Sequence, residues 1–254
     1  VMIIIRHTVE MKIMFNQHFS RRVPTQVKWM FILVILPLYM YCGSLILSAL
    51  FKFIILQFHI QFDYNQLNAY LNLIFDLILL VLAGWLLKDS MIEQFKDFKK
   101  NIKNNLFYGC IVGVLLIYVC QIIGGLLTLA LGGNQTSENQ QLIESITTSY
   151  PVIMIFVSCI LAPIVEEMLF RGIVFGWIYE WNPKMAHLIS AFIFGFIHIM
   201  SAVFAGNLLE WVQIFSYGLM GFALSYLYEK QNNIYVPILS HMMNNIISMC
   251  LVLL

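Results

Sequence analysis

The sequence predicts an all-α membrane protein, a polytopic helical bundle of about seven transmembrane helices. Its 254 residues are 61% hydrophobic and only 11% charged, whereas a soluble domain usually carries about a quarter charged residues. Apolar runs of about 20 residues, the length that crosses the hydrocarbon core of a bilayer, recur along the chain. Of the 14 lysines and arginines, all except Lys52 and Arg171 lie before the first run or in alternate connections between the runs. These three observations together predict a chain that crosses a membrane repeatedly.

Seven hydrophobic segments are the predicted spans. The first is interrupted by Lys52 and the fourth contains charged residues, while the others are clean by hydropathy. In chain order the segments are 29–56, 67–87, 106–131, 151–178, 187–205, 208–228 and 234–254.

The basic residues predict the orientation of these spans. Five precede the first span, five lie between the second and the third, and Lys184 and Lys230 occupy later connections on the same side. The connections 57–66, 132–150 and 206–207 contain no lysine or arginine. The positive-inside rule therefore predicts a cytoplasmic N-terminus and an external C-terminus.

The chain divides into three parts by composition. Residues 1–28 are expected to form a cytoplasmic N-terminal segment, and 29–131 the N-terminal transmembrane helices. Within these, 89–105 places apolar residues at helical intervals between lysines, which is typical of an amphipathic helix on the cytoplasmic surface. Residues 150–254 form the remaining spans and carry most of the polar residues discussed next.

Composition also excludes some functions. The chain has no basic stripe and no basic-aromatic module, so nucleic-acid binding is not expected. All five cysteines lie in apolar segments without a CxxC pair, which argues against a disulfide framework or a zinc knuckle. The expected partners are therefore the lipid bilayer and a membrane-bound peptide or protein.

Polar residues inside the spans are few and lie at similar depth. Ionisable side chains within a membrane cost several kcal/mol to insert, so they are functional candidates. At about 1.5 Å per residue, Glu166, His198 and Asn245 lie roughly 16 to 18 Å from the cytoplasmic ends of three different helices. His241 lies about one turn shallower. The remaining ionisable residues singled out within the spans are Asp76, Glu167 and Arg171.

The spacing of these residues suggests their roles. Glu167 and Arg171 stand at i and i+4, so they can pair on one face of a helix. Glu166 points about 100° away from Glu167 and can face a cavity as a general base. His198 can share the water that this carboxylate activates.

His241 and Asn245 also stand at i and i+4 and present two hydrogen-bond donors on one face. An oxyanion hole needs such donors when a carbonyl oxygen becomes negative. Pro237 precedes His241 by one turn, and we expect it to leave a carbonyl unpaired and to make the helix irregular there.

Structural interpretations compete with these roles. Glu167 and Arg171 can form a purely structural ion pair. Asp76 has no partner at matched depth, so helix packing and a proton path are equally good interpretations. Close helix packing is the favoured interpretation of the glycine pairs Gly109 with Gly113 and Gly124 with Gly125.

At these residues the sequence resembles the CPBP family, the CAAX proteases and bacteriocin-processing enzymes that are also called Abi proteins. The motif EExxxR stands at 166–171, FxxxH at 194–198 and HxxxN at 241–245. The resemblance covers roughly residues 150–250 and is complete at every motif position. One such motif alone would be weak evidence, but three in order at membrane depth are strong evidence.

The resemblance implies an all-helical fold that encloses a conical catalytic cavity. It implies that Glu166 and His198 activate water, while His241 and Asn245 hold the oxyanion. Glu167 and Arg171 would orient that machinery. In bacteria, family members are linked to peptide maturation, bacteriocin immunity and the processing of membrane proteins.

The leading hypothesis is therefore an endopeptidase of a bacterial cell membrane that cleaves a membrane-bound peptide or protein. The alternative is a non-enzymatic bacteriocin-immunity or scaffold protein. No cofactor is expected, although Glu166, His198 and His241 could supply a zinc site with one open position. Because HExxH is absent and Asn245 is a poor zinc ligand, the metal-free mechanism is favoured.

Overall fold

The computed structural model describes residues 23–254 as helices joined by short connections, without a strand in that range. Seven helical stretches within it are long and apolar enough to cross a membrane. The predicted fold class is therefore confirmed, and the chain is a multi-pass membrane protein. Residues 1–22 lie outside the described part, and most of the predicted N-terminal segment 1–28 falls among them.

The first three spans are built from the following elements. The first span consists of short pieces in one line: α2 (Thr25–Met30), η2 (Phe31–Ile35), η3 (Leu38–Cys42) and α3 (Gly43–Phe58). The second is the long helix α4 (Tyr64–Lys100). The third comprises α5 (Ile102–Phe107), η4 (Tyr108–Val112) and α6 (Gly113–Ala130).

The last four spans follow a short helix, α7 (Glu138–Ser149), on the side that carries no lysine. The fourth span comprises α8 (Pro151–Phe156), η5 (Val157–Leu161), α9 (Ala162–Glu167), η6 (Met168–Phe175) and α10 (Gly176–Tyr179). The fifth is α11 (Pro183–Phe204). The sixth and seventh are η7 (Leu208–Gln213) with α12 (Ile214–Gln231), and α13 (Tyr235–Leu253).

Short polar side chains determine where several helices begin. Asp63, Ser137 and Asn182 precede α4, α7 and α11, and each accepts a hydrogen bond from a backbone N–H of the first turn at 2.7 to 3.2 Å. These first-turn donors have no partner within the helix, so the side chains stabilise the helix starts.

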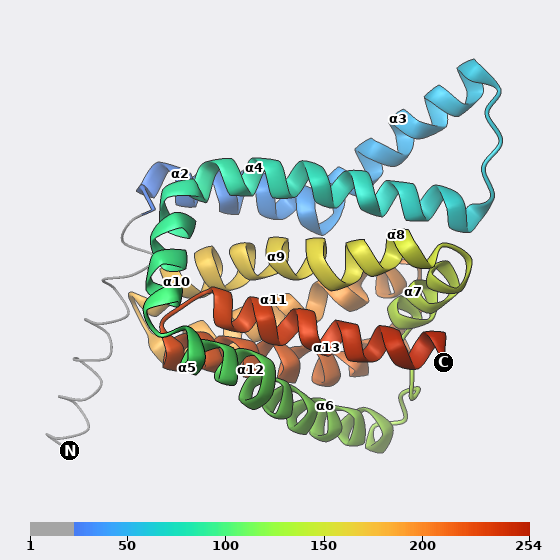
Figure 1. Ribbon diagram of the computed structural model, residues 1–254. Coiled ribbons are helices and arrows are strands. Elements are labelled where there is room, and N and C mark those ends of the chain that lie inside the picture. Colours follow the sequence, from blue (N-terminus) through green and yellow to red (C-terminus); the bar gives the residue numbers. More distant parts are fainter. Residues whose placement is uncertain (1–22) are drawn as a thin grey trace, which may run out of the picture.

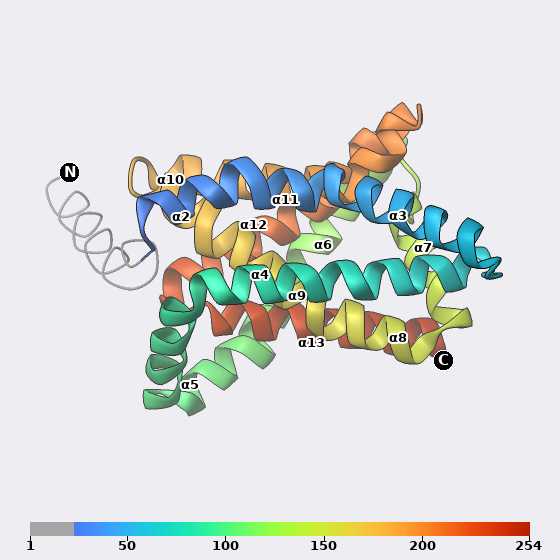
Figure 2. The same ribbon diagram turned by 90° about the horizontal axis from the view of Figure 1, so that it is seen from above.

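The predicted amphipathic segment 89–105 is the end of α4 together with the start of α5. Figures 1 and 2 show α4 bending near its end and running across one side of the bundle. Phe98 is buried there, whereas Ile92, Phe95 and Ile102 stay exposed among lysines. Exposed apolar and cationic side chains on one helix are typical of a membrane surface.

Glycines allow the third span to approach the last two. A Cβ atom on Gly124 would lie 2.6 Å from the backbone oxygen of Phe215, and Gly113 lies directly against the side chain of Ser240. Nothing approaches Gly125, so the packing role predicted for that residue is wrong. Close packing against α12 and α13 thus depends on the other positions.

A polar contact joins the start of α4 to the connection before α8. The Tyr150 hydroxyl donates to the Asp63 carboxylate at 2.6 Å. This hydrogen bond holds the pKa of Asp63 below its usual value and raises the pKa of Tyr150. On the side without lysines, α7 is therefore held between the second and fourth spans.

The first span leaves the bundle towards its end. Figure 1 shows α3 diverging from α4 beyond the level of the site described below. Most side chains of α3 are exposed. The last four spans, by contrast, pack around a buried core, and α4 crosses the fourth of them (Figure 2).

Candidate active site

The fourth span carries two glutamates between widened helical turns. Glu166 and Glu167 end the short helix α9, and π-helical turns lie on both sides, η5 before it and η6 after it. Pro163 lies at the start of α9, where the missing N–H removes one hydrogen bond from the preceding turn. Widened turns of this kind occur frequently at functional sites.

Glu167 is at the centre of a buried ion-pair network. Its Oε1 accepts from Nη1 of Arg171 at 3.1 Å and from Nδ1 of His241, also at 3.1 Å. Nη2 of Arg171 donates to the backbone oxygen of Gly221 at 2.8 Å, and the guanidinium lies 4.6 Å from the centre of the Phe194 ring. Both side chains of the ion pair are fully buried.

This network determines the orientation of His241. A carboxylate paired with a guanidinium can only accept, so Nδ1 of His241 carries the proton of that hydrogen bond. Nε2 then faces Oε2 of Glu166 at 3.9 Å. The i, i+4 pair predicted from sequence is present, and it also holds a third residue from another span.

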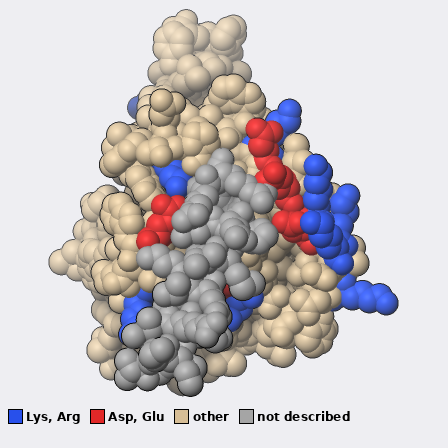
Figure 3. Space-filling view, turned by 90° about the vertical axis from the view of Figure 1, so that its left-hand side faces the viewer, with Lys and Arg blue, Asp and Glu red and all other residues tan. Residues whose placement is uncertain are grey.

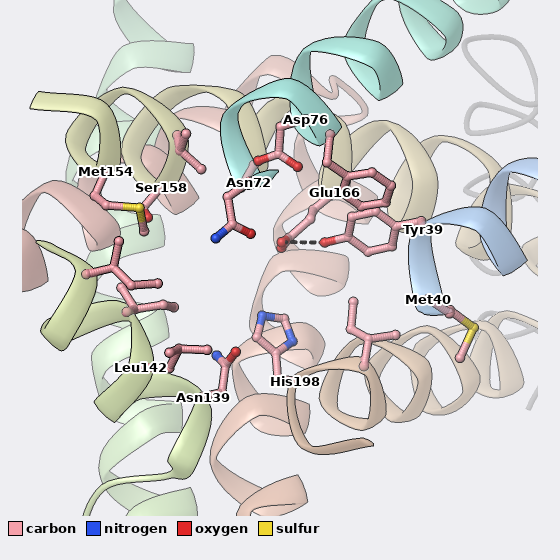
Figure 4. A pocket seen from close by; sticks show the side chains of 16 residues that line it. Tyr39, Met40, Asn72, Asp76, Asn139, Leu142, Met154, Ser158, Glu166 and His198 are labelled. Atoms are coloured by element: carbon pink, nitrogen blue, oxygen red, sulfur yellow. Dashed lines mark hydrogen bonds between the residues drawn. The ribbon is translucent and has the colours of Figure 1, made fainter. Parts of the chain in front are cut away.

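Glu166 occupies the cavity next to this network. Its Oε1 accepts a hydrogen bond from the Tyr39 hydroxyl at 2.7 Å (Figure 4). Its Oε2 has no hydrogen-bond partner among the described residues. One carboxylate oxygen is therefore held by the first span, and the other is buried without a hydrogen bond, 3.9 Å from Nε2 of His241.

His198 projects into the same cavity from α11. Its Nδ1 donates to the backbone oxygen of Phe194 at 2.7 Å, and its ring stacks on Tyr217 at 4.5 Å between centroids. Because a carbonyl oxygen can only accept, the Nδ1 atom is protonated. Nε2 is the atom left for chemistry.

Asn245 lies on α13 one turn beyond His241. Its amide nitrogen donates to the backbone oxygen of Ser158 at 2.8 Å, and its amide oxygen accepts from Asn244 at 3.1 Å. A side-chain amide has two N–H groups. One N–H group of Asn245 therefore remains after the hydrogen bond to Ser158 is made.

The four predicted catalytic residues line one cavity with two lobes. The larger lobe has a volume of about 240 Å³ and the smaller about 160 Å³. Glu166 and His198 line both lobes, while His241 and Asn245 line the smaller one. The structure thus brings these residues together, although the conical shape implied by the family resemblance stays a prediction.

Sequence reasoning missed several residues of this cavity. Tyr39 was absent from the prediction, although counting along its span places it at about the depth of Glu166. Asp76 was predicted to lack a partner, yet it lines the larger lobe together with Glu166. Ser158 and Asn139 line both lobes. Matched depth was the signal that could have found Tyr39.

The zinc alternative requires Glu166, His198 and His241. Residues 23–254 contain no group of three or more His, Cys, Asp or Glu side chains placed to hold a metal ion. Each histidine does use Nδ1 for a neighbour and leaves Nε2 available, an arrangement that metal-binding histidines also show. The five cysteines are free.

Comparisons with known proteins agree with the motifs. Residues 148–247 match a family model described as Rce1-like, the type II CAAX prenyl endopeptidase. The matched range includes all three motifs, so the resemblance predicted from them is confirmed for this segment. No solved structure matches this chain.

Three curated relatives match about half of the chain. "Putative membrane peptidase YdiL" of Bacillus subtilis is 38% identical over 125 residues, 49% of this chain and 47% of that protein. "Membrane-embedded CAAX protease MroQ" of Staphylococcus aureus is 31% identical over 150 residues, 58% of each chain. "UPF0177 protein YvdC" of Lactococcus lactis is 24% identical over 143 residues, 56% of this chain and 52% of the relative. The chain thus spans about half the length of the curated relatives that it matches.

Proposed function

We propose that this chain, whose residues 148–247 belong to the Rce1-like CAAX endopeptidase family, is an intramembrane endopeptidase that hydrolyses a peptide bond of a membrane-associated peptide or protein. One observation carries the proposal. Glu166 lines a cavity that His198, His241 and Asn245 also line, and its Oε2 makes no hydrogen bond within the described residues.

Glu166 supplies the base in this mechanism. Oε2 takes a proton from a water molecule that Nε2 of His198 holds, and the water oxygen attacks the carbonyl carbon of the substrate. When the tetrahedral intermediate breaks down, the C–N bond cleaves and Glu166 returns its proton to the leaving nitrogen. The hydrogen bond from Tyr39 holds the carboxylate in position throughout.

His241 and Asn245 stabilise the oxyanion. Nδ1 of His241 donates to Glu167, and in this mechanism an N–H at Nε2 donates to the substrate oxygen. The remaining N–H of Asn245 is the second donor.

Glu166→Gln tests this function. The amide has nearly the volume of the carboxylate but cannot take a proton, so activity should fall about 100-fold or more at unchanged abundance. Two measurements follow: sequencing of new peptide N-termini in membranes of expressing cells, and cleavage of a farnesylated CAAX peptide in proteoliposomes.

Glu138→Gln is the matched control, because Glu138 is exposed, lines neither lobe of the cavity, and accepts a hydrogen bond from Asn207 in a connection. It should leave the peptide products unchanged. If Glu166→Gln yields the same products as the unchanged protein, the protease function is wrong and a scaffold or immunity role is favoured.

A further inference from the structure

The cavity extends towards one side of the membrane only. From mid-membrane, at Glu166 and His241, its lining continues to α7, to the start of α8 and to the end of α13. These elements all lie on the side whose connections contain no lysine or arginine. Figure 4 shows Leu142 and Asn139 of α7 at the edge of the larger lobe, away from Glu166.

Towards the lysine-bearing side, tightly packed side chains close the cavity. Beyond Glu166, the fourth span continues with large side chains that are at most 1% exposed, and α12 contributes another. Together they separate the cavity from the lysine-bearing side. These residues are Phe170, Arg171, Phe175, Tyr179 and Tyr228.

A polar groove continues from the cavity on its open side. It has a volume of about 660 Å³ and lies between α7 and the end of α13. Gln140, Ser248 and Val252 line both this groove and the smaller lobe, so the two are continuous. Its other polar side chains are Gln141, Glu144, Ser145 and Thr148.

The distribution of charge identifies the two sides. Figure 3 shows lysine and arginine side chains gathered on the face opposite the groove. Basic residues are retained on the cytoplasmic side of membrane proteins. The groove and the open end of the cavity therefore lie on the extracytoplasmic side.

We propose that the active site receives its substrate from the extracytoplasmic side: a membrane-anchored peptide whose scissile bond lies in the outer half of the bilayer and whose polar segment occupies the groove between α7 and α13. The proposal rests on the function proposed above. Amide and hydroxyl side chains along the groove suit the backbone of an extended peptide. Glu144, without a basic residue beside it in the groove, favours an uncharged or cationic segment.

Cysteine labelling tests the side of entry independently of catalysis. In a variant with all five native cysteines replaced by alanine, Thr148→Cys places a thiol in the groove and Lys100→Cys places one on the opposite face. A membrane-impermeant maleimide should label Thr148→Cys in intact cells and Lys100→Cys only after permeabilisation. The reverse pattern would overturn the proposal.

Blocking the groove tests its use by the substrate. Ser248→Cys lies where the groove meets the smaller lobe, and its activity before labelling is the baseline. Labelling intact cells with a bulky impermeant maleimide should reduce processing at least about tenfold, because the water-activating pair becomes inaccessible.

Gln61→Cys is the control, since Gln61 is exposed on the same side but lines neither cavity nor groove. Its labelling should leave processing unchanged. Undiminished processing after labelling of Ser248→Cys would refute the entry route while leaving the protease function intact. Processing by Glu166→Gln at the level of the unchanged protein would instead refute the protease function.

Discussion

The first three spans and the last four differ in how much of each lies inside the protein. The buried share of the apolar window is 17%, 22% and 22% in the first three, against 56%, 44%, 44% and 39% in the last four. The last four form a core that supplies the ion-pair network and all four predicted catalytic residues. The first three form a shell that faces lipid.

The difference has a physical reason. Buried charges are stable only where partners and packing replace water, so Arg171 and Glu167 require the dense packing of the core. The shell also lines the cavity, with Tyr39 and Met40 from the first span, Asn72, Phe75 and Asp76 from the second, and Gln121 from the third. The first three spans thus contribute side chains to the cavity, whereas the ion-pair network of Glu167, Arg171 and His241 lies in the last four.

The largest effect on stability is expected where the core is broken. Arg171→Ala leaves the fully buried Glu167 without its cation, which should cost about 3–5 kcal/mol and reduce both abundance and activity. Lys100→Ala, the control in the shell, removes the cation of an exposed pair with Asp97 and should cost less than about 1 kcal/mol. Thermal unfolding in detergent measures both, and equal effects would contradict the division into core and shell.

A smaller effect, on rate alone, is expected from the oxyanion donors. Asn245→Ala removes one donor and should lower kcat by about 100-fold at normal abundance. Asn68→Ala is the control, because its amide bonds only to the backbone of its own helix in the shell. Peptide cleavage in proteoliposomes provides the rates. An unchanged kcat for Asn245→Ala would remove this residue from the oxyanion site.

Tyr39→Phe tests the contribution of the shell to chemistry. The hydroxyl makes a hydrogen bond to a charged group, and its loss should reduce kcat about tenfold with little change in KM. Tyr41→Phe, an exposed neighbour in the same η3 segment, should change neither constant. A rise in KM with kcat unchanged would assign Tyr39 to substrate binding instead of positioning.

The smallest effect is expected from removing metal. If catalysis depends on the donors His241 and Asn245 and on the Glu166–His198 pair, a strong chelator should leave activity within about twofold of the untreated protein. Metal content of the purified protein is measured in parallel. A tightly held, equimolar zinc whose removal abolishes activity, and whose return restores it, would establish the zinc alternative.

The sequence predicts features along the membrane normal well. Hydropathy gives the seven spans, and residue counting puts Glu166, His198 and Asn245 at one level, in agreement with their positions around the smaller lobe. The i, i+4 rule predicts the pair of Glu167 with Arg171, which the structure contains. These features depend only on position along one helix.

Features that depend on which helix lies beside which could not be predicted in this way. A tyrosine in an apolar span, such as Tyr39, gives no sign that its hydroxyl will reach Glu166. The irregularity expected at Pro237 is absent, because α13 begins at Tyr235 and a proline in the first turn removes no helical hydrogen bond. Widened turns occur instead beside α9, next to Pro163, and also in the first and third spans.

The shared oxygen of Glu167 makes two distant positions thermodynamically interdependent. Because Arg171 and His241 donate to the same atom, replacing either one already loosens the contact of the other. A double-mutant cycle should therefore give a combined loss smaller than the sum of the single losses. Attempts to transplant this site into another scaffold would have to exchange all three residues as one unit.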